Sequence, residues 1–290
     1  MIKIALIFDF DLTLSPFFAQ KVIIDKWNID EAEFWRRCTA KVSDENYDLE
    51  HGYIKVILEY IEENPSFQLS NVDLYELGKS ITLYDGLTRK ENKYSIFEEI
   101  EAILNEDKYA QQNFELECYV ISGGLAPLIE GALQANNISQ YFKKVFACRL
   151  NENRDGYIDF PKETVGHTIK TQKLFTIAKG LEHNVNDKVD NYTIPFENMI
   201  YLGDGQTDIP AFSLINKMGG KSIAVYREIK NIDGTINLFE TKKNYEKIYQ
   251  YTLKTNRVKE LLPADYTNHK QLKKTIEKYI REICVRYIKT

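Results

Sequence analysis

The chain has 290 residues, of which 43% are hydrophobic and 28% are charged, and this composition excludes an intrinsically disordered protein. Its 38 basic and 43 acidic residues give a net charge of −5, so no overall attraction to nucleic acid or to an anionic membrane is expected. No apolar run approaches the roughly 18–20 residues that a membrane span requires. The length allows one large domain or two modest ones.

The N-terminal apolar run and the cysteines indicate a cytoplasmic protein. The run that begins at Ile4 is interrupted by Asp9 and Asp11, which a secretory signal would not tolerate. The cysteines lie far apart in the sequence, and none belongs to a metal-binding C-x-x-C pair. We expect them to be reduced and mostly buried. They are Cys38, Cys118, Cys148 and Cys284.

Four short and continuous apolar runs predict buried parallel strands. They cover residues 4–8, 117–121, 199–202 and 222–226. Three of the runs end in a polar or glycine-rich turn, with the sequences DFDLT, SGG and GDGQTD. Ligands of an open α/β sheet bind at the carboxyl ends of its strands, so these turns predict a single active site.

The long segment between the first two predicted strands has helical periodicity. Helices are expected at residues 17–27, 31–42, 47–62 and 71–82, and the stretch 94–104 is expected to lead back to the sheet. A crossover between parallel strands needs only a dozen or more residues. The excess therefore predicts an inserted helical cap of residues 15–89 on a core of residues 1–14 and 90–290. Hinges are expected near Ser15–Pro16 and Tyr84–Gly86.

The segment after the last predicted strand carries a weaker signal. A helix is possible near residues 242–262, and a better one is expected at residues 268–287, where apolar residues share one face. We expect the last helix to form a scaffold layer or an oligomer contact.

Two acidic pairs follow predicted strands. Asp9 and Asp11 follow the first strand, and Asp204 and Asp208 lie in the turn after the third. Neighbouring carboxylates repel one another unless a cation offsets their charge, and a site of hard oxygen ligands suits Mg²⁺. Because unpaired buried charges are costly, the sequence predicts a metal site where the strand ends meet.

A phosphate site is predicted beside the acidic pairs. Ser122 and the backbone N–H groups of Gly123 and Gly124 are expected at the start of a helix, where small residues allow an anion to approach. Lys170 begins another helical pattern and would supply positive charge. Lys173, one turn later, is the alternative lysine.

Each of these motifs also has a plainer interpretation. A DxD turn alone is more often a loop cap or a surface acidic pair, and it also occurs as the metal–nucleotide site of glycosyltransferases. The glycosyltransferase interpretation leaves Ser122, Lys170 and the second acidic turn unexplained. The Ser-Gly-Gly sequence alone is typical of an ordinary turn. The four motifs together favour catalysis.

The order of these motifs resembles that of the haloacid dehalogenase superfamily. Asp9-Phe10-Asp11-Leu12-Thr13, then Ser122, Lys170 and the turn from Gly203 to Asp208 occur in the order of its four motifs. The pattern is similar to the phosphoserine phosphatase-like group, in which Ser-Gly-Gly also follows the second strand. The matched core covers residues 1–14 and 113–226. The resemblance implies a doubly wound parallel sheet with a Rossmann-like core and an inserted helical cap.

The resemblance also implies roles for individual residues. Asp9 would be the nucleophile that forms an aspartyl-phosphate, and Asp11 would be the general acid and then the general base. Asp9, the backbone carbonyl of Asp11, and Asp204 would hold Mg²⁺, with Asp208 assisting directly or indirectly. Ser122, Gly123 and Lys170 would bind the phosphoryl group, and Lys170 would also restrain Asp9.

The sequence therefore predicts a cytoplasmic, Mg²⁺-dependent phosphomonoester hydrolase that acts on a small phosphorylated metabolite, without nucleic acid or membrane partners. Two alternatives stay open, namely a phosphotransferase or phosphomutase, and a member that binds phosphorylated ligands without turnover. No oligomeric state is predicted. Arg36, Arg37 and Lys41 either contact an acidic substrate or form a solvated helix face, which we favour. Phe17 and Phe18 either line the pocket or pack in the core, and we expect the core.

Overall fold

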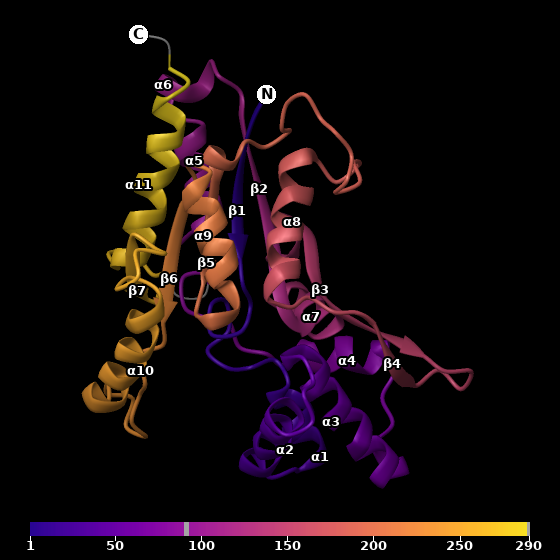
Figure 1. The fold of residues 1–290 in the computed structure, drawn as a ribbon. Helices are drawn as coiled ribbons and strands as arrows, with labels where there is room; N and C mark the ends of the chain where they lie inside the picture. The colour runs from indigo at the N-terminus through magenta and orange to yellow at the C-terminus, as the bar shows by residue number, and fades with distance from the viewer. Residues whose placement is uncertain (90–92, 289–290) are drawn as a thin grey trace.

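A single sheet organises the molecule. The computed structural model describes residues 1–89 and 93–288, and within them seven strands pair in the order β4-β3-β2-β1-β5-β6-β7 (Figure 1). All neighbouring strands are parallel except β3 and β4. The strands are β1 (Ile2–Phe8), β2 (Phe114–Leu125), β3 (Phe142–Glu152), β4 (Ile158–Glu163), β5 (Met199–Gly203), β6 (Lys221–Tyr226) and β7 (Glu260–Pro263).

Helices cover the sheet and extend beyond it. Short helical turns connect several of the elements, and one of them, η4 (Gln206–Asp208), carries part of the site. The helices are α1 (Lys21–Trp27), α2 (Glu31–Ser43), α3 (Leu49–Glu63), α4 (Asn71–Gly78), α5 (Ile96–Leu104), α6 (Asp107–Ala110), α7 (Ala126–Ala135), α8 (His167–Lys179), α9 (Ile209–Lys217), α10 (Leu238–Tyr251) and α11 (Gln271–Val285).

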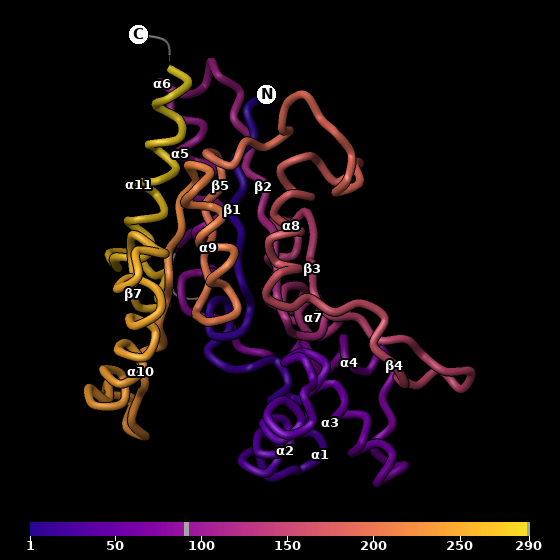
Figure 2. The backbone as a smooth tube through the Cα atoms, viewed as in Figure 1, coloured from indigo at the N-terminus to yellow at the C-terminus, as the bar shows by residue number. Residues whose placement is uncertain are grey.

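Alternation along β1 divides the core into two layers, because successive side chains of a strand point to opposite faces. Ile4, Leu6 and Phe8 belong to one buried cluster, which includes apolar residues of α5, α7 and α11. Ala5 and Ile7 belong to a second cluster, which includes apolar residues of α8 and α9. The sheet is therefore covered on both faces, as the predicted doubly wound α/β fold requires. Figure 2 shows the same layers as a backbone trace.

The four strands predicted from apolar runs are confirmed, but three further strands were not predicted. β3 has a short apolar centre between charged residues, while β4 and β7 each contain a proline, which is tolerated at sheet edges. The helix expected near residues 242–262 is wrong in its second half. There α10 ends at Tyr251, and β7 adds the seventh strand beside β6.

The helix α5 packs against the sheet, whereas the helices α1 to α4 lie beyond the carboxyl ends of the strands (Figure 1). One of them, α4, packs closely against α7. A Cβ atom built on Gly78 would lie 2.2 Å from the carbonyl oxygen of Leu128, and one on Gly131 would lie 2.1 Å from that of Tyr75. Only glycine permits such an approach of two backbones. The predicted boundary of residues 15–89 stays a prediction, and α4 within it is fixed to the sheet's own helices.

The two chain segments that lead into and out of this helical region lie side by side. The backbone N–H of Tyr84 donates to the carbonyl of Leu14 at 2.9 Å, and the hydroxyl of Tyr266 donates to the carbonyl of Thr13 at 2.9 Å. Gly86 has a positive φ of 89°, and a Cβ there would lie 2.1 Å from the backbone of Tyr266. The predicted hinge segments are thus tied together and to the C-terminal part of the chain.

Two further observations concern the cysteines and the character of the helices. The cysteines are free and buried, as the sequence predicts. Across residues 1–89 and 93–288, none of the helices combines the length and the apolar character that crossing a membrane demands.

Candidate active site

The first acidic pair lies in a tight turn directly after β1. The N–H of Asp9 donates to Leu202 of β5 at 2.8 Å, so pairing with that strand continues one residue past Phe8. The N–H groups of Thr13, Leu14 and Ser15 then all point to the carbonyl of Phe10. Leu12 within this turn adopts a φ of 57°, which is uncommon for a residue with a side chain. The turn therefore fixes both aspartates at the end of the sheet's first strand.

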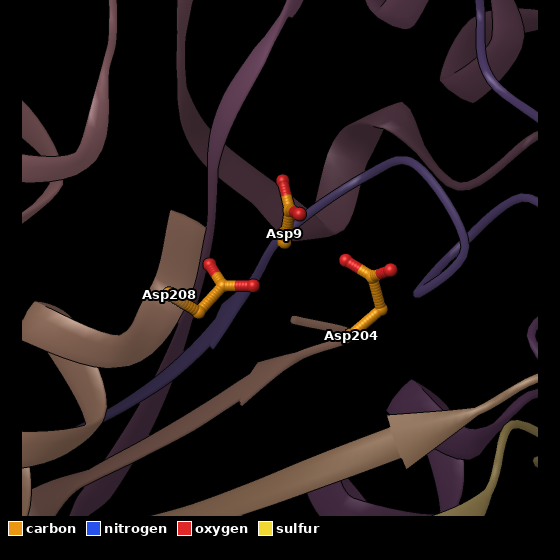
Figure 3. A group of neighbouring side chains, drawn as sticks. All are labelled: Asp9, Asp204 and Asp208. Carbon is orange, nitrogen blue, oxygen red and sulfur yellow. The ribbon is translucent and has the colours of Figure 1, made fainter. Parts of the chain in front are cut away.

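The second acidic pair approaches the first from the end of β5. One carboxylate oxygen each of Asp9, Asp204 and Asp208 lies within 4.8 Å of the others (Figure 3). Glycine at position 203 makes this possible, because a Cβ there would lie 2.4 Å from the carboxylate of Asp208. β1 and β5 are neighbours at the point where the strand order reverses direction. This switch point is where open α/β sheets bind their ligands.

Asp11 lies beside this group but points elsewhere. Its Oδ1 accepts a hydrogen bond from the N–H of Ala19 at 2.7 Å. Its Oδ2 faces β2, since a Cβ built on Gly124 would lie 3.4 Å from that oxygen and 3.4 Å from Oγ of Ser122. The structure therefore brings three of the four predicted carboxylates together, and the fourth faces the predicted phosphate-binding segment.

Lys170 is buried inside the acidic group. Its side chain is 1% exposed, and its Nζ lies 2.7 Å from Oδ1 of Asp208 and 3.2 Å from Oδ1 of Asp9. The hydroxyl of Tyr201 donates to the same oxygen of Asp208 at 2.6 Å. Lys173 points away and pairs with Glu163 at 2.8 Å. Of the two candidate lysines, only Lys170 reaches the aspartates.

The Ser-Gly-Gly segment differs from its prediction in one respect. We expected a helix to begin there, but β2 continues through the segment to Leu125, and α7 begins only at Ala126. A register shift against β3 after Ile121 replaces the expected turn. Ser122 is buried, and its Oγ accepts from the N–H of Gly124 at 3.1 Å. The segment thus presents an irregular strand end to the site, without a helix N-terminus.

Burial and mutual repulsion dominate the electrostatics of the aspartates. Burial raises the pKa of Asp9 to about 6 although Lys170 opposes this, and burial together with the charge of Asp9 raises the pKa of Asp11 to about 7. Burial, followed by the charges of Asp9 and Asp208, raises the pKa of Asp204 well above its ordinary value. Burial lowers the pKa of Lys170, but the charges of Asp208 and Asp9 outweigh it and raise that pKa overall. One lysine therefore leaves the carboxylates undercompensated.

The oxygen ligands present fit a hard divalent cation. Oδ2 of Asp9 and both carboxylate oxygens of Asp204 accept no hydrogen bond from any residue that the structure describes. Asp208 differs, because Lys170 and Tyr201 donate to its Oδ1 and the N–H of Gly205 donates to its Oδ2 at 3.3 Å. The free oxygens suit Mg²⁺, which prefers a few carboxylates and retains several waters. Asp208 instead positions Lys170.

A cavity of about 600 Å³ opens above the aspartates. Asp9, Asp11, Asp204, Ser122 and Gly123 line it, whereas Lys170 and Asp208 lie behind its wall. Much of the remaining wall is apolar or aromatic and comes from the segment between β1 and α1, from α2 and α3, and from α10. These residues are Leu12, Phe18, Trp35, Val42, Leu49, Tyr53, Ile248 and Tyr251.

The cavity wall corrects the expectation for the two phenylalanines after the first motif. We expected Phe17 and Phe18 in the core, but they are 38% and 44% exposed. Phe18 lines the cavity and packs on Trp35, with ring centroids 5.0 Å apart. Adjacent aromatic residues are usually buried, so the sequence alone favoured the wrong alternative.

Several residues of the cavity were not predicted from the sequence. Gln20, Glu50 and Tyr53 come from the helical region, and Lys247 and Tyr251 come from α10. Tyr53 also ties that region to the phosphate segment, because its hydroxyl donates to the carbonyl of Gly123 at 2.9 Å. The periodicity of α3 and α10 indicated amphipathic helices, and it carried no signal that one end of each helix would face a cavity.

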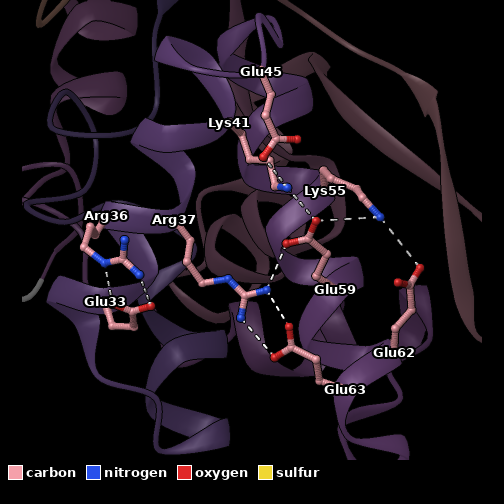
Figure 4. Close-up of polar contacts among 9 residues, drawn as sticks. All are labelled: Glu33, Arg36, Arg37, Lys41, Glu45, Lys55, Glu59, Glu62 and Glu63. Carbon is pink, nitrogen blue, oxygen red and sulfur yellow. Dashed lines mark hydrogen bonds and ion pairs between the residues drawn. The ribbon is translucent and has the colours of Figure 1, made fainter.

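The basic residues of α2 do not contact the site. Each is paired with glutamates on α2 itself, on α3 or just beyond these helices (Figure 4). Arg36 is 69% exposed, as the favoured solvated face requires, whereas Arg37 and Lys41 are only 19% and 14% exposed and lie in an ion-pair network between α2 and α3. The pairs are Arg36–Glu33, Arg37–Glu59, Arg37–Glu63, Lys41–Glu45 and Lys41–Glu59.

The sheet order and the acidic group at its switch point define a haloacid dehalogenase-like fold, and comparison with solved structures confirms this fold. Two phosphoserine phosphatase structures, described as a phospho-aspartyl intermediate analogue and as a substrate-bound complex, match with a TM-score of 0.52 and 19% identity, covering 100% of both chains. A haloacid dehalogenase family hydrolase from Salmonella enterica serovar Typhi matches with a TM-score of 0.51 and 18% identity. That match covers 76% of this chain and 61% of the Salmonella chain.

Comparison of sequences gives a more limited result. The chain is 29% identical over 292 residues to an uncharacterized protein of Borreliella burgdorferi, and the match covers 93% of each protein. No protein-family model matches the chain.

Proposed function

We propose that the chain is a Mg²⁺-dependent phosphomonoester hydrolase that acts on a small phosphorylated molecule through an aspartyl-phosphate on Asp9. The observation that carries the proposal is the buried group at the switch point. There Lys170 holds Asp9 and Asp208, and Asp204 faces Asp9 within 4.8 Å. A cytoplasmic location belongs to the proposal, and the four free, buried cysteines support it.

Asp9 and Asp204 would hold the metal, together with the backbone carbonyl of Asp11. When bound, Mg²⁺ supplies positive charge beside the transferring phosphoryl group and offsets the repulsion among the aspartates. The raised pKa values of Asp9 and Asp204 fit this role. A carboxyl group that ionises with difficulty when no cation is near is stabilised in its ionised form by a bound cation.

Asp9 would act as the nucleophile. Its carboxylate attacks phosphorus, and the bond from phosphorus to the leaving oxygen breaks. The N–H of Phe10 at 2.8 Å and the Nζ of Lys170 at 3.2 Å both contact its Oδ1, so the carboxylate is held in one orientation before the substrate binds. Such orientation lowers the activation free energy, because the carboxylate has already lost the rotational freedom that it would otherwise lose in the transition state.

Asp11 would transfer the proton in both halves of the reaction. As an acid it donates its proton to the leaving oxygen, and as a carboxylate it then takes a proton from the water that attacks the aspartyl-phosphate. Burial and the charge of Asp9 raise its pKa to about 7, which suits a group that must both donate and accept near neutral pH. Its Oδ2 faces Ser122 and Gly124, away from the other carboxylates.

Ser122 and Gly123 would bind the phosphoryl oxygens. Both line the cavity beside Asp9, and a hydroxyl and a backbone N–H are suitable donors for an oxyanion. Lys170 lies behind the wall, so its contribution would be the positive field and the orientation of Asp9.

Hydrolysis of p-nitrophenyl phosphate and of a broad phosphomonoester panel tests the proposal. We expect turnover that requires Mg²⁺, stops on addition of EDTA, and is lost in Asp9→Asn. Asp233→Asn is a matched control, because Asp233 is exposed and does not line the cavity. A competing alcohol should leave inorganic phosphate as the only product, whereas a phosphotransferase would phosphorylate the alcohol. Absence of turnover across the panel would refute the proposal.

A further inference from the structure

Glu50 is the unexplained charge of the cavity. It lies on the first turn of α3, lines the cavity wall, and is only 5% exposed. Its carboxylate accepts from its own backbone N–H, and it forms no ion pair with any residue that the structure describes. Burial raises its pKa. His167 and Lys170 favour its charge only from beyond ion-pair distance, and a buried carboxylate without a direct cationic partner is costly. Its position therefore needs a reason beyond the stability of the fold.

Two glycines of the core make room for this carboxylate. A Cβ built on Gly166 would lie 2.9 Å from Oε2 of Glu50, and one built on Gly123 would lie 3.2 Å from Oε1. Gly123 is also the residue whose carbonyl accepts from Tyr53, one turn farther along α3. The end of α3 therefore places Glu50 directly beside the segment proposed to bind the phosphoryl group.

A side-chain amide of the cavity also has an acceptor without a donor. Gln20, which precedes α1, is 3% exposed and lines the cavity. Its Oε1 is buried and has no hydrogen-bond partner. An unpaired buried acceptor costs about 1–3 kcal/mol, so a donor supplied by a ligand would relieve this cost.

The charges of the wall indicate the kind of ligand that supplies such donors. Asp9, Asp11, Asp204 and Glu50 line the cavity, and Lys247 on α10 is the one cation among its lining residues in the described part of the chain. Once a phosphate dianion is bound, the negative charges of the phosphate and the carboxylates outnumber the positive charges of Mg²⁺, Lys170 and Lys247. The excess of carboxylates then disfavours an anionic leaving group and favours a cationic one.

On these grounds, and resting on the proposed phosphatase function, we infer that the substrate is the phosphomonoester of an amino alcohol, whose ammonium group is bound by Glu50 and Gln20. The ammonium donates to the carboxylate of Glu50 and to Oε1 of Gln20, while the ester's phosphoryl group lies at Asp9 and Ser122. A primary ammonium fits better than a quaternary one, because only the former has N–H donors for the two acceptors.

Matched probes test this inference. O-phosphoethanolamine and propyl phosphate have similar size and differ in an ammonium in place of a methyl group. We expect wild-type kcat/KM to favour O-phosphoethanolamine at least about tenfold, equivalent to about 1.4 kcal/mol. Glu50→Gln should reduce that ratio about tenfold. Asp48→Asn, which removes an exposed carboxylate two residues earlier, should leave the ratio unchanged. The inference would be overturned if the wild type had equal kcat/KM values for glycerol phosphate and O-phosphoethanolamine. It would also be overturned if Glu50→Gln left the ratio of kcat/KM values for the two matched probes unchanged.

A binding measurement separates this inference from the proposed function. Calorimetric titration of Asp9→Asn compares the affinities of the same two probes without any turnover. Tighter binding of O-phosphoethanolamine, lost on adding Glu50→Gln, supports the inference even if the wild type hydrolyses nothing. Hydrolysis of p-nitrophenyl phosphate combined with equal binding of the two probes refutes the inference and leaves the phosphatase proposal intact.

Discussion

Two clusters of charged residues, one at the switch point and one on the outer faces of α2 and α3, differ in how their charges are balanced. In the outer cluster every basic residue has an acidic partner in reach, and the exposed fraction of the side chains ranges from 14% for Lys41 to 70% for Glu62 (Figure 4). At the switch point, three carboxylates approach one another (Figure 3). Lys170, which is 1% exposed, contacts two of them, those of Asp9 and Asp208.

The comparison shows that the local balance of charge indicates function better than the number of charges. The outer cluster neutralises itself near the surface, where each of its side chains keeps some contact with solvent and ion pairs contribute little. The inner cluster is undercompensated and buried, an arrangement that a fold tolerates only when a cation or a substrate completes it. The net charge of −5 gave no hint of this difference.

Apart from loss of the nucleophile itself, the largest expected effect concerns Asp11. Asp11→Asn should lower kcat by about 10²–10⁴-fold, since general acid–base catalysis contributes about that much. Its carboxylate faces Ala19 and the Ser122 segment, so the substitution should leave metal binding nearly intact. Steady-state kinetics and a Mg²⁺ titration by thermal shift provide the check. A variant that loses metal affinity as severely as Asp204→Asn would contradict the assignment.

Removing the inner lysine should destabilise the protein strongly. Lys170→Met leaves Asp9 and Asp208 buried without their cation, and breaking a buried pair in this way typically costs about 3–5 kcal/mol. The control is Lys173→Met, which removes a partly exposed pair with Glu163 and should cost less than about 1 kcal/mol. Urea denaturation measures the free energy of unfolding of both variants. Similar losses of stability would show that Lys170 is no more important for the fold than an ion pair at the surface.

Adding Mg²⁺ should stabilise the protein through the inner cluster alone. At about 100 times its dissociation constant, a ligand that binds only the folded state adds about 2.7 kcal/mol. Asp204→Asn should abolish this gain, because Asp204 offers two oxygens that no described residue occupies. Thermal melts with and without Mg²⁺, in the wild type and in this variant, give the comparison. Equal stabilisation of both proteins would place the metal elsewhere.

Breaking the outer cluster should have only a small effect. Arg37→Gln removes hydrogen bonds to Glu59 and Glu63 and the contact of the guanidinium with the ring of Tyr60, 4.4 Å away. We expect a loss below about 1 kcal/mol and an unchanged kcat/KM. A drop in activity of tenfold or more would mean that the outer face contacts the substrate after all.

The smallest expected effect is the pH dependence of the stability that Arg37→Gln removes. The hydrogen bond from Arg37 holds the pKa of Glu63 below its ordinary value. A lowered pKa contributes stability that is complete above the unfolded-state pKa of about 4.3 and is lost as the pH falls through the folded-state pKa. The difference between the wild type and Arg37→Gln should therefore be full at pH 7 and shrink below about pH 4. Urea melts across this range would show a constant difference if Glu63 is irrelevant.

The sequence predicted the parts of the site that local patterns encode. Asp9, Asp204 and Lys170 follow or begin elements with strong apolar periodicity, so the meeting of strand ends could be anticipated. Glu50 could not, because it resembles every other glutamate of an amphipathic helix. Its burial depends on Gly123 and Gly166, which lie far away in the sequence. The edge strands β4 and β7 were also missed. Each contains a proline, and each becomes a strand only by pairing with a neighbour in the folded sheet, which local sequence patterns do not encode.

The central claim is that Asp9 carries the phosphoryl group during turnover. Acid quenching of the enzyme with substrate and Mg²⁺, followed by mass spectrometry of its peptides, tests this most directly. We predict one phosphoryl group on the peptide that contains Asp9, and none in Asp9→Asn, which should also be inactive. A phosphoryl group on another residue, or continued turnover by Asp9→Asn, would contradict the account.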